Sequence, residues 1–291
     1  MKGIILAGGS GTRLYPITEG ISKQLVNVYD KPMIFYPLSV LMEAGIRDIL
    51  VITTEIDQPN FKRLLGDGSK FGINITYEIQ YAPNGLAEAF IIGEDFIGND
   101  ECTMILGDNI FYGRYLKNDL QTAMANANNG YATIFGNRVT DPERFGIMEI
   151  NDKNEVLSVE EKPLYPKSDI AITGLYFYPK GVSKYAHKVK PSKRNELEIT
   201  TLNDMYLQER LLKAIILESG CLWFDTGTDV SLLEAANMIK TVESNQGIVV
   251  CCPEAIGYYN GWLSKEELSK RAELLSKNKY GKYLKRVKNN K

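Results

Sequence analysis

A short apolar run followed directly by a glycine-rich loop opens the chain and limits what it can fold into. Gly3-Ile4-Ile5-Leu6 predicts a buried strand, and the loop Gly8-Gly9-Ser10-Gly11-Thr12-Arg13 begins at its carboxyl end. Glycines in such a loop let backbone N–H groups approach a polyphosphate closely, because no Cβ stands in the way. Arg13 adds a planar cation for phosphate oxygens, and Lys23 follows. The segment predicts a nucleotide-triphosphate site, whereas the alternative of a tight strand-to-helix turn leaves Arg13 unexplained.

Two common glycine-rich signatures do not match this loop. The dinucleotide-binding pattern Gly-x-Gly-x-x-Gly fails, because Leu14 stands where the third glycine is required. The P-loop pattern fails as well, because Gly11 is followed by Thr12 and Arg13 instead of Lys and Ser or Thr. The loop therefore argues against a nicotinamide-dependent oxidoreductase and against a P-loop nucleotidase.

Charge and composition restrict the partners that the chain can have. A net charge of -2 and a pI near 5.7 argue against nucleic acid as the main partner, because no strong basic field exists. No apolar run approaches the ~20 residues of a membrane span, and the first residues lack a signal-peptide layout. We therefore expect a cytoplasmic protein without a membrane partner. The cysteines have no CxxC spacing and are expected to be reduced thiols, and the single histidine, His187, is expected to be structural.

Strand-like and helix-like segments alternate through the first half of the chain. Residues 48–53 form a continuous apolar run, as expected for a strand covered by helices on both faces. This rhythm predicts an α/β fold with a doubly wound, mostly parallel, Rossmann-like sheet. Residues 146–159 predict an inserted β-hairpin, and the last part of the chain predicts helices. Further predicted strands are 73–79, 103–106, 132–135, 170–178 and 213–218, and the predicted helices include 32–45, 61–65, 86–96, 116–126, 181–189 and 199–211.

Two aspartates are candidate metal ligands. Asp108 follows a predicted buried strand, at the sheet edge where doubly wound folds bind their ligands. Asp225 lies in a predicted turn bounded by Thr226 and Gly227, behind another apolar strand. Mg²⁺ prefers a few carboxylates together with phosphate oxygens, which two aspartates beside a triphosphate loop provide. Either aspartate by itself fits a structural turn cap equally well.

Lys162 and Arg194 are candidate phosphate-binding cations in addition to Arg13 and Lys23. Lys162 follows Glu160 and Glu161 at the end of the predicted hairpin, and Arg194 lies in a polar loop. By residue type alone, both also fit solvated surface positions, so their assignment depends on a wider pattern.

A set of longer motifs shows that the chain resembles the glucose-1-phosphate thymidylyltransferases, a group of sugar nucleotidyltransferases. The similarity extends from Met1 to about Leu284. The matching stretches are residues 2–14, 22–25, 29–33, 106–113, 141–146, 160–163, 171–178, 196–200 and 223–228. The opening loop is shared by many sugar nucleotidyltransferases, whereas the stretches 106–113, 141–146 and 160–163, and the spacing between them, are specific to fewer families.

The resemblance implies a role for each candidate residue. It places Gly8, Gly11, Thr12, Arg13 and Lys23 at the triphosphate, and Gln24, Gln80 and Gly85 at the nucleotide, with Gln80 and Gly85 reading the thymine ring. It places Asp108 and Asp225 at Mg²⁺, Gly146, Glu161 and Thr173 at the glucosyl hydroxyls, and Lys162 and Arg194 at the sugar phosphate. Arg13, Lys162, Asp108 and Asp225 would be the catalytic set. The implied reaction joins dTTP and glucose 1-phosphate into dTDP-glucose and pyrophosphate, the first step of dTDP-sugar synthesis such as that of dTDP-L-rhamnose.

The resemblance also implies an organisation and an assembly. We expect a nucleotidyltransferase domain at residues 1–240, with a nucleotide-binding part at about 1–140 and a sugar-binding part at about 141–228. A helical extension at 241–291 would pack on it, and the family is typically homotetrameric. Phe145 departs from the family pattern, where tyrosine is usual, and this change is expected to loosen sugar preference.

Two alternatives remain open from the residues. The same chemistry with UTP or with another sugar 1-phosphate is the nearer one, because the phosphate-binding residues do not distinguish bases. The other is a non-catalytic regulatory subunit that binds sugar nucleotides. Such a subunit would be expected to lack a metal aspartate or the loop arginine, and Asp108, Asp225 and Arg13 are all present.

Overall fold

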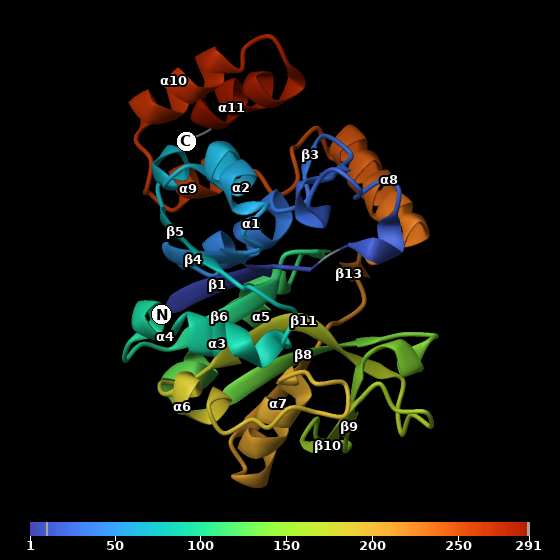
Figure 1. The fold of residues 1–291 in the computed structure, drawn as a ribbon. Helices are drawn as coiled ribbons and strands as arrows, with labels where there is room; N and C mark the ends of the chain where they lie inside the picture. The colour runs from blue at the N-terminus through green and yellow to red at the C-terminus, as the bar shows by residue number, and fades with distance from the viewer. Residues whose placement is uncertain (10, 290–291) are drawn as a thin grey trace.

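A nine-stranded mixed sheet forms the centre of the computed structural model, which describes residues 1–9 and 11–289 (Figure 1). The strand order is β10-β9-β11-β6-β1-β4-β5, with β8 paired to β11 and β12 paired to β8. The strands are β1 (Lys2–Ala7), β4 (Asp48–Thr53), β5 (Asn74–Ile79), β6 (Cys102–Leu106), β8 (Ala132–Arg138), β9 (Gly146–Ile150), β10 (Val156–Glu161), β11 (Ile170–Tyr178) and β12 (Leu212–Ile216).

The parallel half of the sheet aligns the two segments that the sequence singles out. Strand β1 pairs in parallel with β4 and with β6, and Leu6 is in register with Leu106. Because parallel strands end at the same edge, the glycine loop after β1 and Asp108 after β6 begin side by side. Strand β11 then runs antiparallel to β6, β8 and β9. The predicted α/β class with a mostly parallel sheet and an added β9–β10 hairpin is confirmed.

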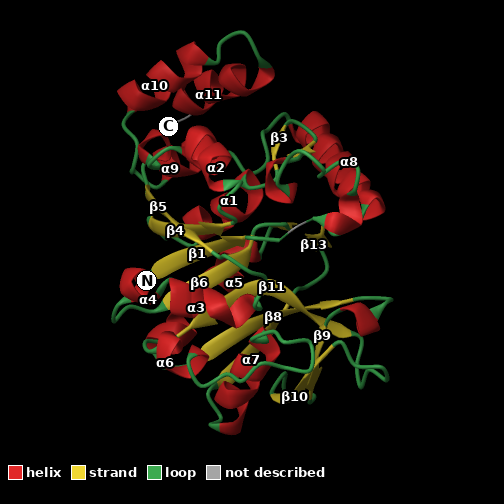
Figure 2. Cartoon of the chain, viewed as in Figure 1, coloured by secondary structure: helices red, strands yellow, loops and turns green. Residues whose placement is uncertain are grey.

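Helices cover both faces of this sheet, as Figure 2 shows. One hydrophobic core lies between the sheet and the helices α1, α2 and α5, and a second lies between the opposite face and α3, α4, α6 and α7. The apolar run of β4 is therefore buried from both sides. These helices are α1 (Phe35–Glu43), α2 (Gln58–Leu65), α3 (Ala89–Ile92), α4 (Glu94–Ile97), α5 (Leu116–Asn128), α6 (Val182–Ala186) and α7 (Ile199–Gln208).

Two small antiparallel sheets, neither of which was predicted from the sequence, lie beside the main one. Strands β2 (Asn27–Val28) and β3 (Lys31–Pro32) form one, and β7 (Asn109–Gly113) and β13 (Cys221–Asp225) form the other. Asp225 is opposite Asn109 in the β7–β13 register. The prediction that Asp225 lies in a turn is therefore wrong, because pairing with β7 extends the strand through this residue. The strand ends at Asp225, and a short loop leads from there to α8.

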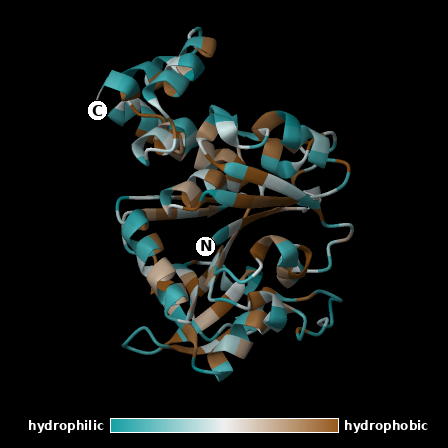
Figure 3. Ribbon diagram, turned by 90° about the vertical axis from the view of Figure 1, so that its left-hand side faces the viewer, coloured by the Kyte–Doolittle hydropathy of each residue, from teal (hydrophilic) through white to brown (hydrophobic). Residues whose placement is uncertain are grey.

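The chain ends in four helices, α8 (Asp229–Gln246), α9 (Pro253–Tyr259), α10 (Lys265–Leu274) and α11 (Lys279–Asn289). Ser264 and Glu267 form a capping box at the start of α10. The last three helices share a small apolar core of their own, and hydrophilic residues are prominent on them in Figure 3. Residue 240, the predicted domain boundary, lies inside α8, and the division into domains stays a prediction. No helix in residues 1–9 and 11–289 is long and apolar enough to cross a membrane.

Candidate active site

A cleft with three lobes lies along the carboxyl edge of the parallel strands. The large lobe has a volume of about 500 Å³, and two smaller lobes of about 200 Å³ each adjoin it. We call the smaller ones the Gln80 lobe and the Arg13 lobe. Within the described residues, Asp108 is the residue that lines all three lobes. Asp108 therefore marks the point at which ligands bound in the different lobes would meet.

The Arg13 lobe is built by the loop after β1. It is lined by Gly9, Gly11, Thr12, Arg13, Leu14, Lys23, Gln24, Asp108 and Gly227. Gly11 has a φ of 63°, which glycine adopts without strain, and its carbonyl accepts a hydrogen bond from Thr18 Oγ1 at 2.7 Å. A Cβ on Gly227 would lie 3.0 Å from Arg13 Nη2, so the guanidinium lies directly against this glycine. Ser10, part of the predicted loop, lies outside the described residues.

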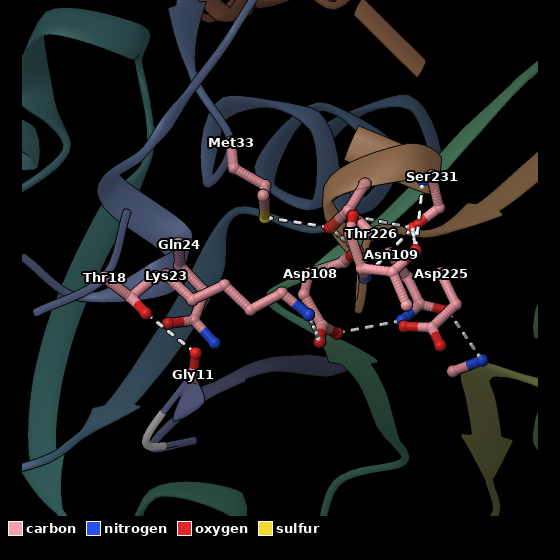
Figure 4. A network of polar contacts seen from close by, with 12 residues as sticks. Gly11, Thr18, Lys23, Gln24, Met33, Asp108, Asn109, Asp225, Thr226 and Ser231 are labelled. Atoms are coloured by element: carbon pink, nitrogen blue, oxygen red, sulfur yellow. Dashed lines mark hydrogen bonds and ion pairs between the residues drawn. The ribbon is translucent and has the colours of Figure 1, made fainter. Parts of the chain in front are cut away.

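Lys23 makes a close ion pair where the three lobes of the cleft meet. Its Nζ lies 2.5 Å from Oδ2 of Asp108, and the Lys23 side chain is buried (Figure 4). Burial by itself would raise the pKa of Asp108, but the charge and hydrogen bond of Lys23 outweigh it and hold that pKa below its usual value. Asp108 is therefore kept as a carboxylate in a partly desolvated place.

Asp225 faces the same place from the end of β13. Thr226 holds the two segments together, because its Oγ1 donates to the carbonyl of Asp108 at 2.8 Å. Burial and the negative charge of Asp108 raise the pKa of Asp225 above its usual value. Two carboxylates in one cleft, placed so that the charge of Asp108 disfavours ionisation of Asp225, form a donor pair for a hard divalent cation. No group of three or more Asp, Glu, His or Cys in the described part of the chain forms a complete metal cage, so other ligand oxygens would have to complete the coordination.

The Gln80 lobe presents an amide whose orientation is fixed. It is lined by Leu6, Gly8, Gly9, Gln24, Gln80, Pro83, Gly85, Leu86, Leu106, Asp108 and Glu196. Gln80 Nε2 donates to Glu88 Oε2 at 2.7 Å and to the carbonyl of Gly85 at 3.2 Å. Its Oε1 lies on the other side, where a Cβ on Gly8 would come within 2.8 Å. The lobe therefore offers Gln80 Oε1 as a hydrogen-bond acceptor, next to the backbone of Gly8.

The large lobe carries a second group of opposite charges. Arg194 donates through Nε to Glu198 Oε1 at 3.1 Å and through Nη2 to both oxygens of Glu198 at 2.9 Å. Arg194 Nη2 also lies 3.2 Å from Glu161 Oε1, and Thr200 Oγ1 donates to the other oxygen of Glu161 at 2.5 Å. Glu198 is buried, so this pairing holds the guanidinium firmly at the wall of the lobe. Lys162 lies at the rim with a half-exposed side chain.

A group of residues that the sequence analysis did not assign also lines the large lobe. Arg144 places Nη1 2.5 Å from Asp141 Oδ2 and Nη2 3.9 Å from Asp225 Oδ2. Its guanidinium lies 5.2 Å from the ring centroid of Phe145, which in turn meets Trp223 edge-to-face at 5.4 Å. Arg144 lies in the matching stretch 141–146, but the sequence does not show whether an arginine in a motif lines a cleft or only supports the fold. Asn109, in the stretch 106–113, was not assigned a role for the same reason.

Comparison with known proteins identifies the family. The family model for nucleotidyl transferases matches residues 2–242. A glucose-1-phosphate thymidylyltransferase of Neisseria meningitidis is 58% identical over 287 residues, covering 99% of both chains. The corresponding protein of Xanthomonas campestris is 55% identical over 283 residues, covering 97% of this chain and 95% of its own. The chain belongs to the nucleotidyl transferase family.

Solved structures agree with this membership. A Bacillus anthracis protein assigned as a glucose-1-phosphate thymidylyltransferase, solved with sucrose, has a TM-score of 0.74 at 40% identity. The alignment covers 82% of this chain and 94% of that one. A UDP-glucose pyrophosphorylase with bound UDP-glucose has a TM-score of 0.72 at 23% identity, covering 83% of this chain and 98% of its own, which shows a shared fold. The chain is thus an enzyme of the nucleotidyltransferase class.

All the candidate residues of this nucleotidyltransferase except Thr173 line the cleft. Gly146, Glu161, Lys162, Arg194 and Asp225 line the large lobe, and the loop residues line the smaller lobes. Gly8 lines the Gln80 lobe and not the Arg13 lobe, which separates it from the other residues expected at the triphosphate. Thr173 is fully buried between two lining residues, and its Oγ1 has no hydrogen-bond partner. The role of each residue toward a ligand stays a prediction.

Proposed function

We propose that this nucleotidyltransferase transfers the thymidylyl group of dTTP to α-D-glucose 1-phosphate, giving dTDP-glucose and pyrophosphate. One observation carries the proposal: three lobes of different chemistry meet at one carboxylate, Asp108. A base, a triphosphate and a sugar phosphate are three ligand parts that must meet at the α-phosphorus. The names of the relatives at 50% identity and above support the choice of dTTP and glucose 1-phosphate.

The Gln80 lobe suits a thymine ring. Because the amide nitrogen of Gln80 is engaged by Glu88 and Gly85, its Oε1 remains as an acceptor. Thymine and uracil carry an N3–H donor on their pairing edge, whereas cytosine and adenine carry an acceptor at the corresponding ring nitrogen. This acceptor therefore disfavours cytosine and adenine. By itself it does not separate dTTP from UTP, or either of them from a guanine nucleotide, whose N1–H is also a donor.

The reaction needs alignment and charge neutralisation more than proton transfer. The phosphate dianion of glucose 1-phosphate is already a nucleophile and attacks the α-phosphorus, and the bond to the pyrophosphate oxygen breaks. Arg13 and Lys23 line the lobe in which the leaving pyrophosphate would lie. Lys162 and Arg194 line the lobe in which the attacking phosphate would lie. Fixed cations at both ends of an in-line displacement lower its barrier by positioning and by electrostatic stabilisation.

Asp108 and Asp225 would hold Mg²⁺ together with phosphate oxygens of the nucleotide. The paired carboxylates fit this ion, since the charge of Asp108 raises the pKa of Asp225 and a cation between them would offset that repulsion. When bound, the ion would neutralise charge on the phosphates. The resemblance to the family also leads us to propose a homotetramer, which sedimentation velocity would test.

Pyrophosphate release by the purified protein tests the proposed function. We expect strong release with dTTP, glucose 1-phosphate and Mg²⁺, and none after addition of a chelator. A parallel reaction with UTP measures base preference, and galactose 1-phosphate measures sugar preference. Absence of release with dTTP and glucose 1-phosphate would contradict the proposal, and release with UTP alone would reassign the nucleotide.

A further inference from the structure

Asn109 joins three separate elements at the floor of the cleft. It is the first residue of β7, directly after Asp108, and only 2% of it is exposed. Its Oδ1 accepts a hydrogen bond from the backbone N–H of Gly174 in β11 at 3.0 Å. The same oxygen accepts a hydrogen bond from the indole N–H of Trp223 in β13 at 2.6 Å. Its Nδ2 donates to Oδ1 of Asp108 at 3.0 Å.

The chemistry of these partners fixes the orientation of the amide. A backbone N–H and an indole N–H can only donate, and an ionised carboxylate can only accept. Turning the Asn109 amide over would place its NH₂ against two donors and its oxygen against the Asp108 carboxylate. Gly174 makes the arrangement sterically possible, because a Cβ there would lie 2.7 Å from Asn109 Oδ1. The amide nitrogen must therefore face Asp108 (Figure 4).

This arrangement holds the Asp108 carboxylate at both oxygens. Asn109 binds Oδ1, and Lys23 binds Oδ2. Lys23 is a cation that a bound triphosphate would also attract, whereas Asn109 is locked by Gly174 and Trp223. Asn109 is thus the partner of Asp108 that keeps its place when the cleft fills.

We propose that Asn109 is a positioning residue that orients the Asp108 carboxylate toward a divalent cation. The inference rests on the proposed function, in which that cation is Mg²⁺. It has a consequence for Trp223, because an indole N–H engaged by Asn109 leaves only the ring of Trp223 to contact a ligand in the large lobe. Residues that orient a metal ligand in this way commonly change metal affinity or activity by ~10–100-fold when they are replaced.

The test measures Mn²⁺ binding directly, by electron paramagnetic resonance of free Mn²⁺ in the presence of dTTP, and kinetics separately. We expect Asn109→Ala to weaken Mn²⁺ binding about tenfold and to lower kcat by a similar factor, with the KM for dTTP within about twofold. Asn126→Ala is the matched control, since half-buried Asn126 also makes two side-chain hydrogen bonds, to Thr133 and Lys213, away from the cleft. Unchanged Mn²⁺ affinity and kcat in a folded Asn109→Ala protein would overturn the proposal.

A second variant keeps the proposal falsifiable if Asn109→Ala does not fold. Trp223→Phe keeps an aromatic ring, although a smaller one, and removes the donor to Asn109 Oδ1. We expect a smaller loss of Mn²⁺ affinity in the same direction, and no change in either Mn²⁺ affinity or kcat would contradict the role of Asn109. Because Mn²⁺ binding is read without turnover, a wrong substrate assignment would show as an inactive unmodified protein and would leave this comparison intact.

Discussion

The Lys23 ammonium lies 2.5 Å from Oδ2 of Asp108, although the two residues are 85 positions apart in the sequence. The pair joins the loop after β1 to the end of β6, where the three lobes of the cleft meet. Both side chains lose water in this position, and the pairing offsets the cost of burying their charges. Removing Lys23 therefore changes the pKa of Asp108.

Lys23→Met is expected to move the acid side of the pH–activity profile to higher pH. Burial raises the pKa of Asp108 and Lys23 lowers it, so without Lys23 the Asp108 pKa rises and the carboxylate is protonated at a higher pH. The measurement is kcat/KM for dTTP against pH. Lys2→Met, which removes a lysine–aspartate pair outside the cleft, is the control. An unshifted acid limb in Lys23→Met would contradict the electrostatic role of Lys23.

Asp108→Asn and Asp225→Asn are each expected to lower turnover by about two orders of magnitude or more while the protein stays folded. Each change keeps the side-chain shape and removes a charged oxygen donor, so that the remaining carboxylate binds a divalent cation weakly. Steady-state rates over a Mg²⁺ titration and a thermal denaturation curve are the measurements. Asp229→Asn alters an exposed aspartate four residues from Asp225 and is expected to change neither. Near-normal turnover in either cleft variant would remove that aspartate from the metal site.

Gly227→Ala is expected to lower turnover about tenfold without lowering stability. The new Cβ would lie 3.0 Å from Arg13 Nη2, and the flexible arginine side chain can move away at little cost to folding. A displaced Arg13 guanidinium would stabilise the charge that develops on the leaving pyrophosphate less well. Small misplacements of this kind reduce rates strongly. Gly20→Ala is the control, because a Cβ there would have no neighbour within 4 Å. Melting temperature and kcat are compared, and an unchanged kcat would show that Arg13 does not act from this position.

Arg194→Lys is expected to raise the KM for glucose 1-phosphate about tenfold and to leave the KM for dTTP nearly unchanged. Lysine cannot reproduce the planar grip on Glu198 and still present a donor to the lobe. Loss of one hydrogen bond to a charged group, worth ~1.5–3 kcal/mol, corresponds to roughly tenfold or more in affinity. Arg138→Lys, in an exposed ion pair with Asp169, is the control. Equal increases in both KM values would place Arg194 outside the sugar-phosphate grip.

The sequence predicted the main sheet well, because its strands carry strong local signals. Strand β4 is an unbroken apolar run, and its predicted bounds match the structure. The predicted helix at residues 86–96 was less accurate, since the structure divides this segment at Gly93 into α3 and α4 after a 3-10 turn. Strands β2 and β3 have only two residues each, and β7 and β13 are apolar segments of only five residues, so these four strands were not predicted. Their pairing depends on partners far away in the sequence.

The sequence predicted which residues belong to the candidate site, but it did not predict the contacts between them. The motifs named most of the residues that line the cleft, but nothing local shows that Arg144 approaches Asp225 or that Asn109 binds Trp223. The contact between Asn109 and Trp223 exists because β7 and β13 pair. Thr173 differs in another way, since it lies in a matching motif but its side chain is fully buried and does not line the large lobe, and its role stays a prediction.

The pairing of β13 with β7 determines how late in synthesis the candidate site can be completed. Asp225 and the segment that holds it beside Asp108 leave the ribosome long after the glycine loop and β6. A nascent chain that has emerged only through β12 can form most of the main sheet, yet it lacks one of the two carboxylates proposed to bind Mg²⁺. Activity should therefore begin late in synthesis, after the scaffold has folded around it.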